Sequence, residues 1–599
     1  MHNPWHYAAI CVCVAAAYGC GQGPDDGPLE DPAVNAAALT ANQSSLWGVA
    51  GELFDPKGRL MDWSYAGYRA GEAALPTLTP TLSVVDHGAT ADDSSDDTAA
   101  FVAALAAAKA GDVVGVPAGR FIVKKTLTLK SGVVLQGAGP DKTILDIPVS
   151  LTDAYGNSGL SGGGTSSYSF GAAFIEADGS DGGAKLADVS AAAKRGDTTL
   201  SLDTTSGIAV GDWVQIEQTD VKGELIKRLH ADLLPGGDDN IGDKGMDFYT
   251  RVTAVNSGGI EIERALPVDV ELGWSPTLKS VKPKSSEVGV EHLAIEFPTT
   301  TYPGHFKEQG YNAIHFNGMQ DAWVRNVRIK NTDYAVNVTN GHFITVQGVV
   351  IEADAKRSGH HGLNNGHGGD NLFIGFDIKT QLVHDITNEW YATGIVVTQG
   401  RGDDLAMDHH RAAPYSTLWT ELDCGAGTRP FKSGGSGNRG PHTAAYDTLW
   451  NLTAAKDMSL APDDYGPRMN YVGFRTKTTT LTSPYDWWLE NRDPATLDPP
   501  NLWLAMRTKR LGGSAGAGGA GGTGGAGVGG GAGSSLGGGA GAGTGGAAGS
   551  AGGAGVGGAQ PKPSEDDSGC GCRVPAHNGS GGSWWWLALA LAALRRRRQ

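Results

Sequence analysis

Short apolar runs, separated by Gly, Asn and Asp, recur through the middle of the chain. The clearest of them are residues 113–116, 126–129, 133–135, 322–329, 342–351, 371–378 and 383–386. Strands of this length with turn residues at each corner are typical of a solenoid, in which every coil stacks on the previous one. The pattern therefore predicts an all-β solenoid, whose coils bring residues that are far apart in the sequence onto one lengthwise groove.

One segment departs from the strand pattern and has helical spacing. Asp96, Asp97 and Thr98 stand at its start, where a carboxylate or hydroxyl can cap free N–H groups and suits the positive end of a helix. The apolar residues that follow, from Phe101 to Ala108, recur on one face. This indicates one helix that ends before Gly111.

Residues 185–280 have a different pattern of apolar and polar positions from the segments on either side of them. Residues 196–202 and 210–216 alternate apolar and polar positions next to Gly-Asp turns. Alternation of this kind is typical of antiparallel strands with one buried face. We expect a small antiparallel β module inserted into the solenoid.

Four motifs near the start of the body carry a resemblance to a known family. They are Val-Val-Asp-His-Gly-Ala-Thr-Ala-Asp at 84–92, Asp-Asp-Thr-Ala-Ala-Phe at 96–101, Val-Pro-Ala-Gly-Arg-Phe at 116–121 and Val-Leu-Gln-Gly-Ala-Gly at 134–139. In this order they resemble the opening of the pectate-lyase superfamily, and within it the rhamnogalacturonase/epimerase-like branch. The resemblance implies a right-handed parallel β-helix, capped at its N-terminal end by the helix, and a polysaccharide partner.

Composition narrows the class of protein. The 599 residues include 47 Lys and Arg against 64 Asp and Glu, a net charge of −17. This balance argues against a nucleic-acid partner, which normally requires a basic surface. No apolar stretch reaches the ~20 residues of a membrane-spanning helix, which excludes a polytopic membrane protein.

The N-terminal segment has the pattern of an export signal. A short apolar run, residues 8–17, ends in Ala17-Tyr18-Gly19-Cys20. A run of this kind followed by small residues is typical of a secretory signal. Cys20 after Gly19 resembles a bacterial lipoprotein processing site, so residues 1–20 predict either lipidation of Cys20 or plain secretion. Residues 21–44, rich in Gly, Pro, Asp and Ala, then read as a tether.

The C-terminal segment has three parts. Residues 511–568 are mainly a Gly-rich linker, and residues 569–599 hold Cys570, Cys572, an apolar run that begins with three Trp, and four Arg. This arrangement resembles the C-terminal sorting tags of myxobacteria. We therefore expect a monomeric, exported protein at the outer membrane or surface of a Gram-negative bacterium, attached by a lipid, by the C-terminal anchor or by both, or else secreted. The body divides into N-terminal coils (45–184), the inserted module (185–280) and the remaining coils (281–510).

Histidine and other ionisable residues concentrate between residues 360 and 442. Glycines flank several of the histidines, which predicts turns or loops on a rigid scaffold, where functional sites are usually built. The candidate catalytic residues are His361, His367, His410, Tyr391, Asp403 and Asp408. The candidate substrate-binding residues are His360, Asn364, Asn365, Asp370, His384, Glu389, Arg401, His409, Arg411 and Arg439. We expect the residues between 360 and 411 to meet on one face around one groove. A structural polar ladder and a metal site are the other interpretations of the histidines.

Two reactions fit such a groove in a polysaccharide-binding scaffold. β-Elimination requires a base, an acid and a cation that neutralises a uronate carboxylate, and an Arg side chain or a Ca²⁺ cofactor could supply the charge. Inverting hydrolysis requires two carboxyl groups on either side of the scissile bond, with Asp403, Asp404, Asp408 and Glu389 as the candidates. We expect a lyase, with an inverting hydrolase and a non-catalytic glycan-binding surface protein as the alternatives.

Overall fold

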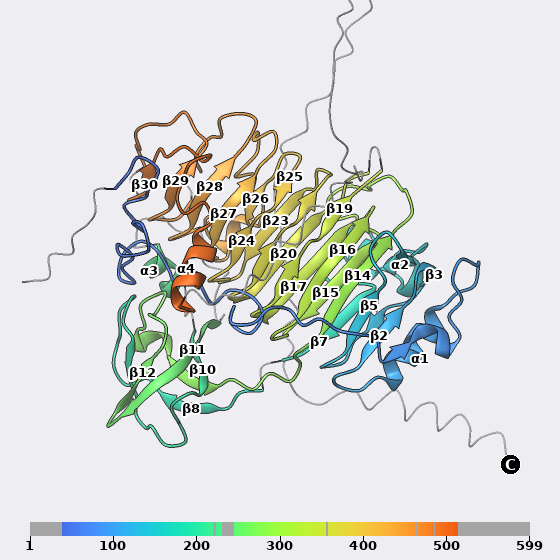
Figure 1. Ribbon diagram of the computed structural model, residues 1–599, viewed down its shortest axis with the longest axis horizontal. Helices are drawn as coiled ribbons and strands as arrows, with labels where there is room; N and C mark the ends of the chain where they lie inside the picture. The colour runs from blue at the N-terminus through green and yellow to red at the C-terminus, as the bar shows by residue number, and fades with distance from the viewer. Residues whose placement is uncertain are drawn as a thin grey trace, which may run out of the picture.

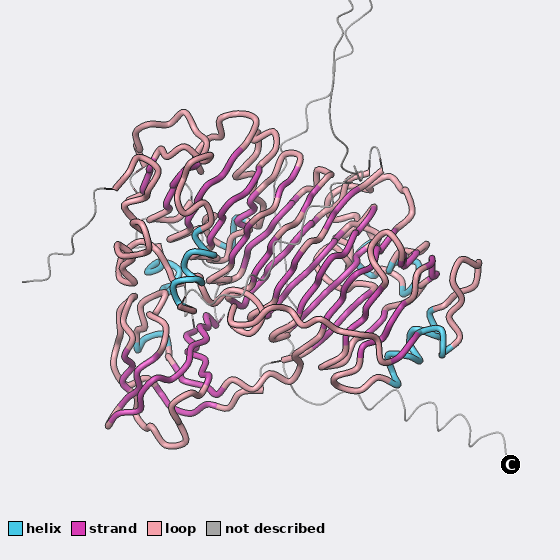
Figure 2. Tube along the Cα trace, viewed as in Figure 1, coloured by secondary structure: helices cyan, strands magenta, loops and turns pink. Residues whose placement is uncertain are grey.

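The computed structural model describes residues 39–512, except 181, 220–222, 231–244, 355–356, 463–464 and 484. Its main body is a right-handed parallel β-helix, as the sequence predicts, and the successive coils form rows of parallel strands (Figures 1 and 2). Each complete coil contributes strands to three faces, which we call A, B and C.

Faces A and B form one continuous sheet, because β14 (Gly289–Glu296) and β16 (Trp323–Lys330) run through the corner between them. Face A also contains β1 (Leu82–Ser83), β2 (Val113–Val116), β5 (Val134–Gly137), β18 (Thr345–Gln347), β21 (Leu372–Ile374), β24 (Val396–Thr398), β27 (Leu418–Asp423), β28 (Thr448–Thr453), β29 (Asn470–Phe474) and β30 (Trp488–Glu490). Face B also contains β3 (Gly119–Ile122), β6 (Thr143–Asp146), β19 (Val350–Glu352), β22 (Asp377–Ile378) and β25 (Arg401–Gly402).

Face C is a separate parallel sheet. Its strands are β4 (Leu127–Thr128), β7 (Ile175–Asp178), β15 (Asn312–Asn317), β17 (Tyr334–His342), β20 (His361–Gly369), β23 (His384–Glu389) and β26 (Met407–His409). The register places Val336 beside Leu363 and Leu363 beside Ile386, so equivalent residues of successive coils lie next to one another.

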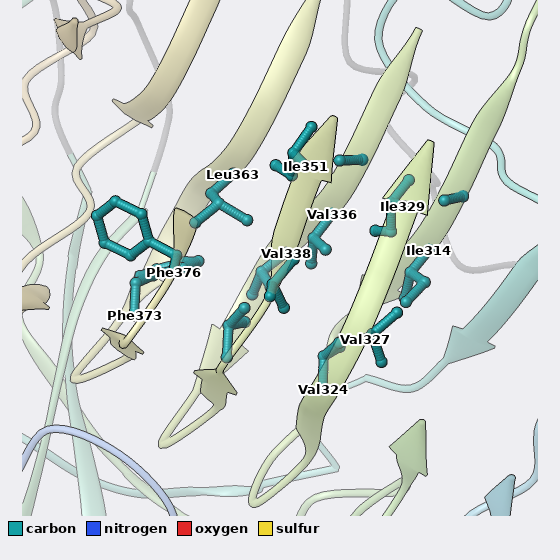
Figure 3. Close-up of a cluster of buried hydrophobic side chains, with 14 of the residues drawn as sticks. Ile314, Val324, Val327, Ile329, Val336, Val338, Ile351, Leu363, Phe373 and Phe376 are labelled. Carbon is teal, nitrogen blue, oxygen red and sulfur yellow. The ribbon is translucent and has the colours of Figure 1, made fainter. Parts of the chain in front are cut away.

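The interior of the β-helix is a stack of aliphatic and aromatic side chains. Val336 and Leu363 from face C meet Val324, Ile351 and Phe373 from the other two faces (Figure 3). Each is almost fully buried, which favours the folded state by roughly 1.5–3 kcal/mol per large side chain. This core fixes the register of the strands and therefore the positions of polar side chains on the outer surface.

The predicted helix caps the N-terminal end of the core. It is α1 (Thr98–Ala107), and Phe101 packs against Phe121 at 5.9 Å between ring centroids. The Oδ1 atom of Asp96 accepts a hydrogen bond from the amide of Thr98. Asp97 instead accepts from the amides of Thr90 and Ile122, so it ties the helix start to β3.

The predicted antiparallel module is also present. Its strands are β8 (Lys185–Asp188), β9 (Thr199–Ser201), β10 (Trp213–Thr219), β11 (Gly245–Asn256), β12 (Gly259–Ile262) and β13 (Thr277–Ser280), paired in the order β8-β13-β10-β11-β12-β9. It lies to one side of the β-helix (Figure 1). Arg264 fixes it there through two 2.7 Å hydrogen bonds to the buried carboxylate of Asp370.

The remaining helices are short and lie outside the coils. They are α2 (Leu151–Tyr155), α3 (Glu224–Leu229) and α4 (Leu502–Arg510), with 3-10 turns η1 (Val84–His87), η2 (Ser158–Leu160), η3 (Leu272–Trp274) and η4 (Gly437–Arg439). No helix in the described part of the chain is both long and apolar enough to cross a bilayer.

The terminal predictions fall largely on residues that the structure does not describe. The signal peptide, Cys20, the linker beyond residue 512 and the sorting tag lie outside the described residues and remain predictions. The predicted tether, 21–44, is too long at its end, because Gln43 and Ser44 are buried and Gln43 forms a β-bridge with Asp498. Cys424, the one cysteine among the described residues, is buried and free.

Candidate functional site

A cluster of imidazoles lies on the outer side of face C, where β20, β23 and β26 run side by side. Strand register places Tyr334, His361 and His384 next to one another in three successive coils. Their rings stack at 4.6 Å between Tyr334 and His361 and at 4.7 Å between His361 and His384. The stacking of coils therefore places side chains that are far apart in the sequence in direct contact.

Asp408 is the centre of the cluster. Its Oδ2 atom lies 2.9 Å from Nδ1 of His384 and 2.8 Å from Nδ1 of His410, so the carboxylate bridges two imidazoles. The hydroxyl of Thr387 donates to the same oxygen at 3.1 Å and lies 3.1 Å from Nδ1 of His361. The amide of Gly434 donates to the other oxygen at 2.8 Å. The four contacts fix the position of the carboxylate.

Burial and neighbouring charges shift the protonation of these groups in opposite directions. Burial and the neighbouring histidines hold the pKa of His361 well below its usual range. Burial alone would lower the pKa of His410, but the carboxylate of Asp408 raises it above the usual value. Burial alone would raise the pKa of Asp408, whereas His384 and His410 hold it well below its usual range. The cluster thus combines an ionised carboxylate with imidazoles of different basicity.

A second group of side chains extends the cluster toward the preceding coil. His360 lies beside His305, with 4.6 Å between ring centroids, and its Nδ1 atom is 3.5 Å from Oε1 of Glu308. Glu308 accepts hydrogen bonds from the hydroxyls of Ser169 and Tyr302, and burial raises its pKa.

A buried ion pair holds the end of the segment that carries this second group. Arg357 and Asp333 are joined at 2.5 Å, and both side chains are 1% exposed. Asp333 also accepts hydrogen bonds from the amides of Gly310 and Tyr311. The pair therefore fixes the end of the segment that carries His305 and Glu308.

The cluster is closed in this structure. His361, His384 and His410 are each only 3% exposed. Gly434 covers them so closely that a Cβ atom there would lie 2.5 Å from Cε1 of His384 and 2.9 Å from Cε1 of His410. A bulky ligand therefore reaches the imidazoles only if the segment around Gly434 moves.

A partly exposed strip of polar side chains continues along face C from the cluster. Thr339 donates to Oδ1 of Asn317 at 3.1 Å on neighbouring strands. Farther along the strip, Glu389 accepts a 2.9 Å hydrogen bond from Arg439, whose guanidinium lies 4.3 Å from the ring centre of Trp390. Asn317, Thr339 and Glu389 are the partly exposed members of this strip, whereas Trp390 and Arg439 are buried behind them.

The structure brings together five of the predicted site residues and places three others beside them. His360, His361, His384, Asp408 and His410 form the cluster. Glu389 and Arg439 lie next to it in the polar strip. Asn364 lies one coil from Thr387 and donates to Asn337 at 2.9 Å on the same outer side.

The expectation that all the candidates between residues 360 and 411 meet in one groove is wrong. Arg401 belongs to β25 on face B and pairs with Asp377 at 2.6 Å, and the exposed Asp403 follows it in the chain. Face B turns away from the imidazole cluster on face C, because each coil bends at its corners. Proximity in sequence therefore misled the prediction for these two residues.

Three other candidates serve contacts with the module or the neighbouring coil. Nε2 of His367 lies 2.8 Å from the carbonyl of Gly245 in β11, and Asp370 pairs with Arg264. Tyr391 is buried in a separate apolar group with Ala413 and Tyr415.

The last three candidates face the interior or the loop that follows. His409 points the other way from His410, and its Nε2 atom lies 2.9 Å from the buried Asp447. The side chain of Asn365 accepts from Asn371 at 2.7 Å, and Arg411 donates to the carbonyl of Gly440. Alternation along a strand explains why His409 and His410 differ.

The sequence patterns missed His305, Glu308 and Tyr302. These residues lie in a stretch without regular strands between β14 and β15, so no periodicity relates them to the later coils. Only the combination of Tyr, His and Glu within seven residues could have drawn attention to them.

Several solved structures have a low similarity to this protein. The tailspike protein gp49 from Pseudomonas phage LKA1 is 12% identical, over 65% of this chain and 70% of that one, with a TM-score of 0.40. A family 28 exopolygalacturonase from Yersinia enterocolitica is 10% identical over 69% and 68% of the two chains, with a TM-score of 0.34. A polygalacturonase from Erwinia carotovora ssp. carotovora is 12% identical over 70% and 99%, with a TM-score of 0.33.

The family comparison concerns the N-terminal coils. No curated protein matches the sequence significantly. Residues 81–176 match the family described as rhamnogalacturonase A/epimerase, pectate lyase-like, and this range holds all four of the motifs that carry the resemblance. The similarity to this family is therefore confined to the first coils of the β-helix.

Proposed function

We propose that the protein cleaves a uronate-containing polysaccharide by β-elimination at the imidazole cluster of face C. The observation that carries this proposal is the bridge of Asp408 between His384 and His410, with His361 stacked beside them. Imidazole is the side chain best suited to both accept and donate protons near neutral pH. The name of the family that matches residues 81–176 is consistent with a polysaccharide substrate.

Two of the imidazoles, His361 and His410, have separate roles in the proposed reaction. His361 takes the proton from the carbon next to the uronate carboxyl. The electron pair of that C–H bond forms a carbon–carbon double bond, while the bond to the leaving glycosidic oxygen breaks. His410, whose imidazolium is stabilised by Asp408, gives a proton to that oxygen. The products are one chain with an unsaturated uronate and one with a free hydroxyl.

The polar strip supplies the binding surface for the sugar chain. Its Arg439 guanidinium, which pairs with Glu389 beside the ring of Trp390, would exchange that carboxylate for a uronate carboxylate of the substrate. The segment around Gly434 acts as a lid, because it must lift before the sugar reaches His361 and His410. Closing such a segment over the substrate would exclude water from the reaction.

Inverting hydrolysis has less support from the positions of the carboxylates. Asp403 and the neighbouring Asp404 are remote from the cluster, and Asp404 accepts hydrogen bonds from Thr428 on an exposed loop. Glu389 is occupied by Arg439. A hydrolase would need two of these groups on opposite sides of one glycosidic bond.

We further propose that the enzyme works outside the cytoplasm, where polysaccharides are available. The pattern ending at Cys20 and the Cys-Trp-Arg pattern of residues 569–599 support export and attachment to a membrane. Changing Cys20 to Ala should abolish labelling by a lipid precursor, and deleting residues 569–599 should shift the protein between membrane and soluble fractions. An unchanged distribution in both variants would contradict the attachment.

A panel of uronic-acid and neutral polysaccharides tests the reaction. The wild-type protein should release products with the ultraviolet absorbance of an unsaturated uronate from at least one acidic polymer. His361→Gln and His410→Gln should each lower kcat by about 10²–10⁴-fold. His87→Gln, far from the site in η1, is the matched control and should retain full activity. Full activity of both site variants, or binding without cleavage, would contradict the proposal.

A further inference from the structure

We propose that His305, His360 and His384 hold a divalent transition-metal ion, most suitably Zn²⁺. One ligand atom from each of these side chains lies within 4.8 Å of the others. The backbone aligns two of them, because the amide of His360 donates to the carbonyl of Asp333 and the amide of His384 to the carbonyl of His360. Neighbouring coils thus supply two of the ligands, and the segment before β15 supplies the third.

The chemistry of the ligands selects the class of ion. Neutral imidazole nitrogens suit Zn²⁺ and other late first-row metals, whereas Ca²⁺ requires six to eight oxygen ligands. The Ca²⁺ ion considered from the sequence therefore fits these three residues poorly. A zinc ion about 2.1 Å from each nitrogen places the nitrogens about 3.4 Å apart, so the side chains need to contract by at most about 1.4 Å.

Carboxylates orient two of the three imidazoles. Asp408 lies 2.9 Å from Nδ1 of His384, and Glu308 lies 3.5 Å from Nδ1 of His360. Metal-binding histidines commonly have a carboxylate on the ring nitrogen that does not bind the metal. Despite these short distances, neither ring nitrogen of His360 or His384 has a hydrogen-bond partner of good geometry within the described part of the chain. A metal ion would satisfy one nitrogen of each ring.

The charge balance also favours a dication. The side chains of Glu308 and Asp408 are fully buried, and no Lys or Arg of the described chain forms an ion pair with either. Asp333, by contrast, has Arg357. A cation bound beside these two carboxylates would therefore not compete with a Lys or Arg of the described chain.

A second trio, His384, Asp408 and His410, also lies within 4.8 Å. It is less suitable, because Oδ2 of Asp408 is already in contact with Nδ1 of both histidines and with the hydroxyl of Thr387. A metal there would have to displace these contacts. In the first trio, the ring nitrogens of His360 and His384 have no hydrogen bond of good geometry to displace.

The ion would also serve the proposed reaction. It would lie beside His361 and could attract the uronate carboxylate, which makes the neighbouring C–H bond more acidic. This role rests on the proposed β-elimination, whereas binding of the ion does not. Metal binding is therefore measured separately from activity.

Metal content of the purified full-length protein tests the site. After removal of metal with a chelator and addition of Zn²⁺, elemental analysis should find one zinc per chain. His360→Gln and His384→Gln should each bind zinc at least tenfold more weakly. His361→Gln, the neighbouring imidazole outside the trio, is the matched control and should retain one zinc. Addition of Co²⁺ to the wild type should give the visible absorption of a tetrahedral site, which the His360→Gln variant should lack.

Thermal unfolding of each variant without metal distinguishes loss of the site from loss of the fold. A variant that unfolds as cooperatively as the wild type but binds no zinc supports the site. Absence of bound zinc in the wild type, or one zinc retained by a folded His360→Gln variant, would overturn it. Loss of zinc on His410→Gln but not on His360→Gln would place the ion in the second trio and equally overturn the assignment. Cleavage of a polysaccharide by a metal-free wild type would remove the catalytic role alone.

Discussion

Asp408 is the residue through which the imidazoles of the site are coupled. Its carboxylate contacts His384 and His410, and its position is fixed by Thr387 and Gly434. Asp408→Asn keeps the shape but removes the negative charge that stabilises a protonated His410. We expect kcat on the cleaved polysaccharide to fall by about 10²–10³-fold with a small change in KM. Unchanged kcat would show that Asp408 has only a structural role.

His315 provides a prediction on the pH dependence of stability. It lies on β15, and burial lowers its pKa to about 4, below the usual value of 6.5. The unfolded chain therefore binds a proton at this residue before the folded protein does, so the free energy of unfolding falls as the pH decreases from about 6.5 to 4. His315→Asn should reduce this loss by about 2 kcal/mol, measured by urea unfolding at pH 7.5 and pH 4.5. Parallel curves for the variant and the wild type would contradict the assignment.

The sequence predicted which types of side chain form the site better than it predicted which residues they are. The density of histidines between residues 360 and 410 pointed to His361, Asp408 and His410, which do lie together. It also included Asp403 and His409, because spacing along the chain does not tell which side of a coil a residue faces. His305 and Glu308 could not be predicted, because the irregular segment that carries them has no periodicity.

A buried ion pair joins the inserted module to the β-helix, beside a shared apolar core. Arg264 and Asp370 are 1% and 3% exposed, and the guanidinium also lies against the rings of Tyr65 and Phe248. Arg264→Met would leave the carboxylate of Asp370 buried without its partner, which typically costs about 3–5 kcal/mol of stability. Chemical denaturation should show this loss. Arg251→Met, which removes a partly exposed pair with Glu72, is the control and should cost less than about 1 kcal/mol.

A loss below about 1 kcal/mol in Arg264→Met would mean that the apolar contacts alone hold the module.

The strands themselves were predictable from the sequence. The alternation at 210–216 and the motifs at 116–121 and 134–139 overlap strands β10, β3 and β5. The docking of the module was not, because Asp370 and Arg264 are 106 residues apart and only the fold brings them together.

The last helix of the described chain, α4, packs against face A of the β-helix (Figure 1). Leu502, Trp503 and Met506 of this helix are buried in a core that also contains Trp47 and Trp63. A chain that ends after residue 512 should therefore keep its Tm within about 2 °C of the full-length protein. A chain that ends after residue 500 should lose several kcal/mol of stability, because each large apolar side chain removed from a core costs about 2–5 kcal/mol. Equal Tm values for the two truncations, measured by calorimetry, would place the boundary elsewhere.

β-Elimination and hydrolysis differ in whether water is added to the cleaved bond. The decisive measurement is mass spectrometry of the products formed from an acidic polysaccharide in water labelled with heavy oxygen. β-Elimination adds no water, so we expect an unsaturated uronate at one new chain end and no label in either product. Incorporation of one labelled oxygen for each bond cleaved would identify hydrolysis and contradict the reaction proposed for His361 and His410.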